Sequence, residues 1–369
     1  MKDLFEILDA SKKELEALSP MKSVDSDRLW RKFRLEWNYN SNHLEGNTLT
    51  YQETELVLIF DQAPGGHTVR EIEEMKAHDV AIALVRDWAL DTAREISESD
   101  IRTLNQTLLV RPFWKEAITP DGQPVRRLIK IGAYKELPNS VRLPNGELFA
   151  YAEPHEVDSK MGDLMAWYRK AAKKEHPAFV AAKLHYDFVC IHPFDDGNGR
   201  IARLLMNYHL FRCGFAPVII KSEGKRAYLS ALNRADVGDF EAFVQYIGEQ
   251  MLWSMNLTIR ASKGESIEEE GDWGKQISLL KRAVVDQKTK AEQEKSRYED
   301  LITDWLVMNA ATVIQEMENR IGVFREFFKA TRFQIQTQAN PGNEVIQFED
   351  PILWQGLPRI LRRRKHMIK

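Results

Sequence analysis

Helical periodicity runs through most of the first 260 residues, and one stretch rich in proline and glycine interrupts it. Apolar residues recur at the three- and four-residue spacing that predicts amphipathic helices in segments 4–18, 27–47, 51–60, 70–90, 97–110, 155–172, 177–191, 201–214 and 227–259. Prolines and glycines break this pattern between about residues 112 and 154. The chain is therefore expected to be mainly α-helical, with one non-helical insertion.

A β-hairpin is predicted inside that insertion. Residues 140–151 read SVRLPNGELFAY, and two short strand-like runs flank Pro144, Asn145 and Gly146, a strong turn signal. This hairpin is the one clear β feature that the pattern indicates in the first 260 residues. An isolated hairpin is only marginally stable in water, so we expect either a functional flap or a plain surface hairpin.

Several helix boundaries and faces can also be predicted. Gly46 and Asn47 form a stop signal for the helix that begins near residue 27. Thr50 is the expected N-cap of the next helix, and Glu53 completes a capping box. The first helix is expected to bury one apolar stripe, formed by Leu4, Ile7, Leu8, Leu15 and Leu18.

The composition is that of an ordinary globular protein and excludes several classes. Of 369 residues, 43% are hydrophobic and 29% charged, and the net charge of −3 argues against nucleic-acid binding through overall charge. The two cysteines, Cys190 and Cys213, exclude a disulfide framework, and no Cys/His spacing fits a zinc site. Because we find no signal-peptide pattern and no run of about 18 apolar residues, we expect a cytoplasmic protein that does not cross a membrane.

The C-terminal residues 275–369 form a separate region behind a polar, acidic stretch at 262–274. Residues 275–330 have a charged helical pattern, 332–349 alternate like two strands around Pro341 and Gly342, and the tail at 358–369 is strongly basic. This order resembles a winged-helix layout, so DNA binding by the region is conceivable. An interaction or packing appendage is the favoured interpretation, because no recognition helix stands out.

The sequence HPFDDGNGR at residues 192–200 carries the strongest chemical signal. Gly197, Asn198 and Gly199 directly precede a strong helical pattern, so their backbone N–H groups lie at a helix N-terminus, which favours anions such as phosphate. Arg200 and Arg203 share one face of that helix and lean towards its N-terminus. Two arginines beside such a nest indicate more than one phosphate group.

The first half of the same segment supplies groups for catalysis. Asp196 adjoins the nest, and a carboxylate beside a polyphosphate is the usual arrangement for Mg²⁺. His192 can act as a general base near neutral pH. Each element alone is more often structural: a packed histidine, a plain turn or a solvated aspartate pair. Their joint occurrence predicts transfer from a nucleoside polyphosphate to a hydroxyl group.

The extended segment HPFDDGNGRIAR resembles the signature of Fic-domain proteins, H-P-F-x-[DE]-G-N-G-R-x-x-R, at every fixed position. GAYK at 132–135 is similar to the G-x-Y-R segment of that family, with Lys135 in place of arginine, and the hairpin at 140–151 lies where the family carries its flap. The resemblance covers about residues 28–255. It implies a Fic-like helical bundle with an N-terminal helical region (1–110, inhibitory helix at about 28–47), a core (111–262) and the appendage (275–369).

The resemblance implies that the protein transfers AMP from ATP and Mg²⁺ to a Ser, Thr or Tyr hydroxyl of an unidentified target protein. His192 would be the general base and Asp196 would bind Mg²⁺. Phosphates would be held by Gly197, Asn198, Gly199, Arg200 and Arg203, with Arg203 on the γ-phosphate. Tyr228 and Asp236 match positions that line the nucleoside pocket. The flap would dock the target by strand addition through Val141, Arg142, Leu143, Gly146 and Glu147.

A second motif lies far upstream. SNHLEGN at 41–47 is similar to the inhibitory motif of the family, [ST]-x-x-x-E-[GN], through Ser41, Glu45 and Gly46. The alternative is an ordinary helix end with a glycine stop. A glutamate near a helix C-terminus is unfavourable unless a cation faces it. By resemblance, Glu45 would pair with Arg203 and prevent productive binding of ATP.

Other functions stay open at this point. Some inhibited members of the family use the glutamate to remove AMP, and a non-enzymatic, nucleotide-gated regulator with DNA or protein binding by the C-terminal region is a third alternative. Gly199 argues against the kinase branch, in which lysine replaces this glycine. Transfer of UMP, GMP or phosphocholine, and assembly into a homo-oligomer, are not excluded.

Overall fold

The computed structural model describes residues 1–118, 124–138, 140–142, 148–269, 333–336 and 345–348. The chain divides into two compact units, Met1–Ile277 and Ser278–Lys369. The expected helices at 275–330, the basic tail at 358–369 and the flap residues Leu143, Gly146 and Glu147 lie outside the described residues.

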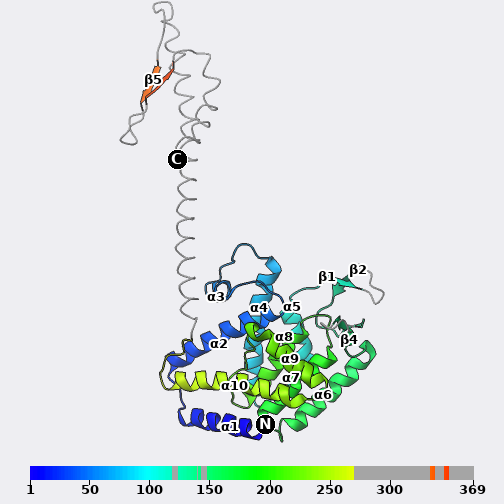
Figure 1. Cartoon of the computed structure of the whole chain (residues 1–369). Coiled ribbons are helices and arrows are strands. Elements are labelled where there is room, and N and C mark those ends of the chain that lie inside the picture. The colour runs from blue at the N-terminus through cyan, green and yellow to red at the C-terminus, as the bar shows by residue number, and fades with distance from the viewer. Residues whose placement is uncertain (119–123, 139, 143–147, 270–332, 337–344, 349–369) are drawn as a thin grey trace, which may run out of the picture. The chain divides into compact units, whose positions relative to one another are not determined.

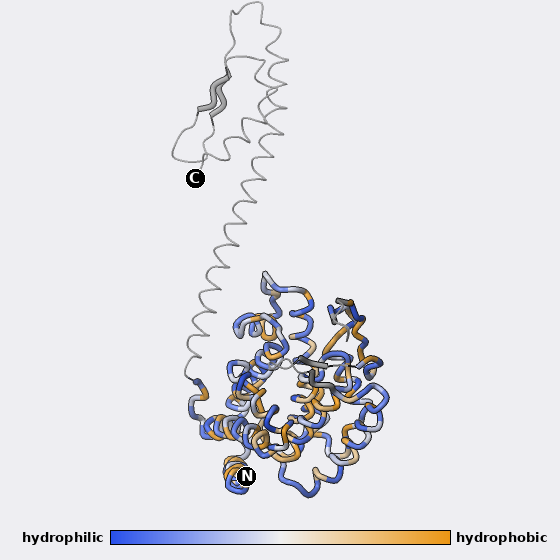
Figure 2. The backbone as a smooth tube through the Cα atoms, turned by 45° about the vertical axis from the view of Figure 1, so that its right-hand side comes forward, coloured by the Kyte–Doolittle hydropathy of each residue, from blue (hydrophilic) through white to orange (hydrophobic). Residues whose placement is uncertain are grey.

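The first unit is built from helices, which confirms the mainly α prediction (Figure 1). They are α1 (Lys2–Ala17), α2 (Ser23–Leu44), α3 (Tyr51–Ile59), α4 (Val69–Leu90), α5 (Glu98–Leu109), α6 (Val157–Ala171), α7 (Pro177–Ile191), α8 (Asn198–Arg212), α9 (Lys225–Asp236) and α10 (Phe240–Ser262). Short 3₁₀ turns occur at Pro154–Glu156 and Ser222–Gly224. In Figure 2, polar and apolar positions alternate along the helical tubes, as amphipathic helices require.

Helices α7 and α8 lie at the centre of this unit and pack against each other. One apolar cluster joins them to α2, α4, α5 and α6, and a second joins them to α1, α9 and α10. Almost every residue of α8 from Asn198 to Leu210 is buried. The N-terminus of α8 is therefore fixed by packing on several sides.

Local signals determine where several helices begin and end. Thr50 and Glu53 form the predicted capping box of α3, and Thr68 and Ser97 cap α4 and α5 in the same way. Helix α2 ends at Leu44, and Gly46 follows it with a φ of +97°, as the stop signal predicts.

One expectation for α1 is wrong. Leu4 and Leu8 are buried against α10, but Ile7 is 52% exposed. The predicted stripe was too wide for a peripheral helix, which buries only the narrow face that meets its neighbour.

The non-helical insertion contains two hairpins rather than one. Strands β1 (Phe113–Ile118) and β2 (Pro124–Ile129) pair antiparallel from Phe113↔Ile129 to Ile118↔Pro124. The sequence pattern does not predict this pair, because prolines and glycines surround its strands. The predicted hairpin is confirmed as β3 (Ser140–Arg142) and β4 (Leu148–Ala150), with Val141 opposite Phe149.

In the second unit, β5 (Phe333–Gln336) and β6 (Val345–Phe348) pair antiparallel, as the alternation at 332–349 predicts. Across the described part of the chain, no helix has the length and apolar character needed to cross a membrane. Cys190 and Cys213 are free thiols, as expected.

Two valines of α4 offer a matched test of the core. Val85 is fully buried in the cluster around α7 and α8, whereas Val80 is 52% exposed on the same helix. Val85→Ala should lower the free energy of unfolding by about 2 kcal/mol, since two buried methyl groups and their packing are lost. Val80→Ala should change it by less than about 0.5 kcal/mol. Chemical denaturation of both variants measures the difference, and similar losses would contradict this packing.

Candidate active site

The loop between α7 and α8 holds the HPFDDGNGR segment in a tightly fixed shape. Phe194 is fully buried, its backbone N–H donates to Asn198 Oδ1 at 3.0 Å, and Asn198 Nδ2 donates to the Phe194 carbonyl at 2.8 Å. Gly197 adopts a φ of +83° and precedes the first residue of α8. Asn105 Nδ2 of α5 donates to the Asp196 carbonyl at 2.9 Å. The expected nest therefore lies at the N-terminus of a buried helix.

His192 ends α7 in the left-handed conformation, with a φ of +51°. The Tyr151 ring stacks on the imidazole, with centroids 3.9 Å apart and an interplanar angle of 18°. Burial, and then the charge of Lys135, lower the pKa of His192 to about 4. The imidazole is thus neutral at pH 7 and free to accept a proton.

Lys135 is buried, and its charge acts on this histidine. Its backbone N–H donates to the Pro193 carbonyl at 2.8 Å, and its ammonium donates to the Ile191 carbonyl at 3.4 Å. Burial lowers the pKa of Lys135 to about 8. Lys135 therefore supports the loop on both sides of His192.

Asp196 has both carboxylate oxygens in polar contacts. Oδ1 accepts the Gly197 backbone N–H at 2.7 Å, and Lys115 Nζ of β1 lies 3.1 Å from Oδ2. Burial raises the pKa of Asp196, but Lys115, Arg200 and the Gly197 N–H outweigh it, so the pKa lies below the ordinary value. The carboxylate is ionised at pH 7.

The neighbouring Asp195 pairs with Arg127 of β2 and accepts the Lys130 backbone N–H at 3.4 Å. Together with the Lys115–Asp196 pair, this attaches the β1–β2 hairpin to the acidic half of the loop. Lys115 is thus a site residue that the sequence interpretation missed along with its strand.

Arg203 is brought together with the upstream motif. Its Nη2 donates to Glu45 Oε1 at 2.7 Å and to the Ser41 carbonyl at 2.9 Å, and its Nε donates to Ser41 Oγ at 2.9 Å. The Arg203 side chain is 4% exposed and that of Glu45 is 36% exposed. Burial raises the pKa of Glu45, but the charges of Arg203 and Arg200 lower it by a larger amount. The pKa therefore lies below the ordinary value, and the carboxylate is ionised.

The position of Glu45 explains one glycine of the loop. A Cβ atom built on Gly199 would overlap the Glu45 carboxylate. Gly199 therefore leaves the space into which this side chain extends, directly over the first turn of α8. An anionic group already lies where the sequence predicts an anion nest.

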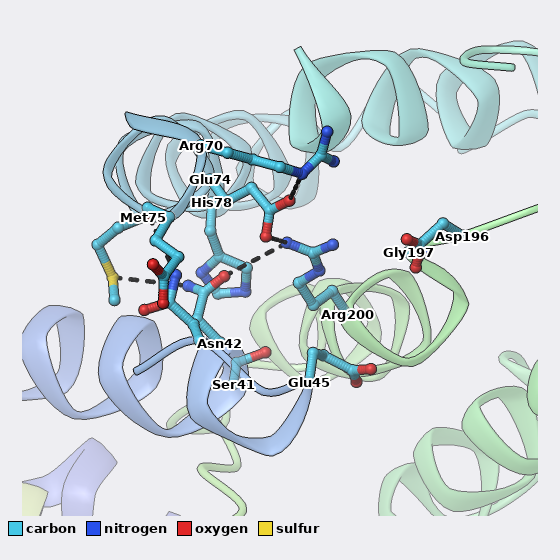
Figure 3. Close-up of polar contacts among 12 residues, drawn as sticks. Ser41, Asn42, Glu45, Arg70, Glu74, Met75, His78, Asp196, Gly197 and Arg200 are labelled. Atoms are coloured by element: carbon cyan, nitrogen blue, oxygen red, sulfur yellow. Dashed lines mark hydrogen bonds and ion pairs between the residues drawn. The ribbon is translucent and has the colours of Figure 1, made fainter. Parts of the chain in front are cut away.

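Arg200 has partners that the sequence interpretation did not foresee. Its Nη1 lies 3.1 Å from Glu74 Oε2 of α4 and donates to Asn42 Oδ1 of α2 at 3.5 Å (Figure 3). The spacing of Arg70 and Glu74, four residues apart on α4, was a visible signal of an ion pair on that helix. Its link to Arg200 requires the tertiary fold.

Of the remaining predicted residues, Tyr228 is brought close to Arg203, whose charge and hydrogen bond act on the Tyr228 hydroxyl. Tyr228 is buried in the second apolar cluster, and its hydroxyl lies 3.0 Å from His185 Nε2. Asp236 Oδ1 accepts the Tyr186 hydroxyl at 3.0 Å. Val141 and Arg142 lie in β3, which pairs only with β4 within the described ranges.

The residues present can be tested against a metal ion. Among the described side chains, no group of three or more His, Cys, Asp or Glu is arranged to hold one. Asp196 therefore fits Mg²⁺ only as a single protein ligand, with phosphate oxygens and water completing the shell, which is a common mode for this ion.

Known proteins are similar to this chain in sequence and in fold. Residues 95–210, which include the loop and most of α8, match the profile of the Fic/DOC family. The crystal structure of a Fic domain containing signaling protein from Bacteroides thetaiotaomicron is 43% identical, with a TM-score of 0.66, over 72% of this chain and 99% of that chain. Fic-1 from C. elegans is 26% identical, with a TM-score of 0.60, over 72% of this chain and 73% of that one.

Curated relatives are similar over a shorter share of their length. The protein adenylyltransferase Fic of Nematostella vectensis is 30% identical over 231 residues, which are 62% of this chain and 49% of the relative. Fic-1 of Caenorhabditis elegans, also named a protein adenylyltransferase, is 30% identical over 241 residues, 65% of this chain and 44% of the relative. The chain thus spans about half the length of the curated relatives it matches.

The histidine environment predicts a titration result. Lys135→Met removes a nearby cation, so the pKa of His192 should rise from about 4 towards its ordinary value of 6.5. Ring-nitrogen NMR of labelled histidines measures the midpoint, and His209, whose pKa of about 4 reflects burial and Arg212, serves as the control. Because the folded pKa lies below the unfolded one, the stability that His192 contributes is lost as pH falls from about 6.5 to about 4. An unmoved His192 midpoint would contradict this assignment.

Proposed function

Because the chain belongs to the Fic/DOC family, we propose that it is a protein adenylyltransferase held in a self-inhibited state. It transfers AMP from ATP to a Ser, Thr or Tyr hydroxyl group of a target protein. The observation that carries the inhibited state is the Arg203–Glu45 ion pair over Gly199. The names of the curated relatives and the neutral histidine beside the nest support the reaction itself.

In the proposed reaction, His192 takes the proton of the target hydroxyl, whose oxygen attacks the α-phosphorus of ATP. The bond from that phosphorus to the bridging oxygen breaks, and pyrophosphate leaves. The backbone N–H groups at the start of α8 bind the phosphate oxygens, while Arg200 and Arg203 bind the distal phosphates. A base beside the α-phosphate, rather than the γ-phosphate, determines that AMP and not phosphate is transferred.

Asp196 is the residue that would hold Mg²⁺, and its ionised carboxylate fits that role. When bound, the ion offsets phosphate charge at the start of α8. Lys115 now occupies one oxygen of Asp196, but its side chain is 55% exposed, so it can withdraw at little cost.

Glu45 inhibits in two ways in this proposal. Its carboxylate engages the guanidinium that the γ-phosphate needs, and it lies in the space beside Gly199 where phosphate would approach. ATP can then enter only with Glu45 displaced, or with its α-phosphate away from His192. Among the described strands, β3 has a partner only in β4, which supports target docking by strand addition at its other edge, where backbone hydrogen bonds would orient the acceptor hydroxyl.

Release of Glu45 should increase transfer. Glu45→Gly is expected to raise incorporation of labelled AMP, into the protein itself or an added target, at least about tenfold, which corresponds to about 1.4 kcal/mol of inhibition. Mass spectrometry of the products after incubation with each nucleoside triphosphate and Mg²⁺ identifies the transferred group and the acceptor residue.

Two variants control this experiment. Asp27→Asn removes an exposed carboxylate of α2, the helix that ends directly before Glu45, and should leave the rate of transfer unchanged. His192→Ala in the Glu45→Gly background should abolish transfer. An unchanged rate in Glu45→Gly would reject the inhibitory role, and release of free AMP from a modified target by the parent protein would favour the reverse reaction.

The metal requirement gives a separate test. Asp196→Asn in the Glu45→Gly background should reduce transfer by about a hundredfold, because charge stabilisation by the ion is worth several kcal/mol. Titration with Mg²⁺ after chelation should show saturation in Glu45→Gly, with a much higher requirement in the Asp196→Asn variant. Full activity in the presence of EDTA would contradict the role of Asp196.

A further inference from the structure

Three charged residues form a continuous polar chain beside the phosphate site (Figure 3). Arg70 Nε lies 2.7 Å from Glu74 Oε1, and the other oxygen of Glu74 lies 3.1 Å from Arg200 Nη1. The side chains of Glu74 and Arg200 are 17% and 3% exposed, so this chain is largely screened from water. Arg70 and Glu74 come from α4, outside the signature segment.

Glu74 holds Arg200 by one side of its guanidinium. Nη1 is engaged by Glu74 and Asn42, whereas Nε is buried and has no partner among the described residues. Figure 3 shows Glu74 and Asn42 on one side of this guanidinium, and Asp196 and Gly197 on the other. A buried donor without a partner is costly, and a phosphate oxygen would satisfy it.

Arg203 lies one turn further along α8, and its Nε is hydrogen-bonded, unlike that of Arg200. Its Nε and Nη2 both donate to Ser41 or Glu45. The edge formed by Nε and an adjacent Nη is one of those with which arginine grips a phosphate through two hydrogen bonds. Arg203 must therefore be released before it can bind phosphate, whereas Arg200 already has its Nε free.

Arg70 compensates the charge of Glu74. An isolated carboxylate this close to the nest would repel the phosphates as well as hold Arg200. Two guanidinium groups and one carboxylate give the set of Arg70, Glu74 and Arg200 a net charge of +1. The Arg70 guanidinium stacks 3.1 Å from the centroid of the Phe113 ring, which fixes its position, and its Nη2 is buried without a partner in the described part of the structure.

We infer that Glu74 is a positioning residue for the polyphosphate of the nucleotide, and that Arg70 acts through it. Glu74 fixes Arg200 so that its Nε edge faces the distal phosphates, and Arg70 keeps the Glu74 carboxylate from repelling them. This inference rests on the proposed function and adds two residues of α4 to the nucleotide site. Glu45 is thus a restraint on one signature arginine, and Glu74 a support for the other.

Binding of Mg²⁺-ATP and of AMP, measured by titration calorimetry in the Glu45→Gly, His192→Ala background, in which Arg203 is released, tests the role of Glu74. Glu74→Asp keeps the charge but shortens the reach to Arg200, and should weaken ATP binding about tenfold, the worth of one charge-assisted hydrogen bond. AMP binding should change by less than about twofold, since AMP has no distal phosphates. The matched control is Glu73→Asp, because the adjacent Glu73 pairs with Arg111 at 2.8 Å and should affect neither ligand.

The outcomes separate the inference from the function on which it rests. Equal or tighter binding of ATP by Glu74→Asp, or an equal loss for ATP and AMP, would overturn the positioning role. Absence of nucleotide binding by the Glu45→Gly, His192→Ala protein itself would overturn the proposed function as well.

A double-mutant cycle tests the role of Arg70. With glutamate at position 74, Arg70→Gln should lower the affinity for ATP to about a fifth of the parent value, because no cation then offsets the charge of the Glu74 carboxylate. In a Glu74→Gln background, the same change should alter the affinity by less than about twofold. The same loss in both backgrounds would show that Arg70 does not act through Glu74.

Discussion

The ion pair between Glu45 and Arg203 joins two segments that lie 158 residues apart in the chain. It is possible only because both partners are held by other contacts. Arg203 lies in a helix that is buried on all sides, and the C-terminal half of α2 is fastened along its length. Arg34 donates to both oxygens of Asp79 at 2.6 Å, Asn40 accepts the Ser222 N–H at 2.8 Å, and Lys225 donates to the Leu44 carbonyl at 2.8 Å. A partly exposed pair of this kind is worth little by itself, so its effect depends on this fixed framework.

Three cations around the start of α8 each pair with a carboxylate. Lys115 faces Asp196, Arg200 faces Glu74 and Arg203 faces Glu45. Each cation that could bind phosphate therefore has a carboxylate partner within the protein. The two arginines differ in which side is engaged: Glu45 holds the Nη2 of Arg203, whereas Glu74 holds the Nη1 of Arg200. The chemistry of the site is thus determined as much by these carboxylates as by the arginines.

The sequence was sufficient for the features that depend on local spacing. It predicted the helices, the α3 capping box, the β3–β4 hairpin and the helix start at Gly197, because each is specified within a few residues. It failed where proximity comes from tertiary packing. Contacts to the 192–200 segment come from distant parts of the chain, namely from Tyr151, Lys115 and Glu74. No spacing in the sequence predicts these contacts. The sequence does not predict the β1–β2 pair, because the prolines and glycines in and around it favour turns over strands.

Glycine at position 199 has a consequence for the physical nature of the inhibition proposed for Glu45. The Glu45 carboxylate fills the volume that a side chain at position 199 would occupy, so under the proposed function Glu45 and an incoming phosphate compete for space as well as for a cation. Dissolved salt screens the attraction between charges, but it does not change the volume of atoms. Occlusion by Glu45 is therefore expected to survive ionic strengths that would weaken an inhibitor acting through charge alone.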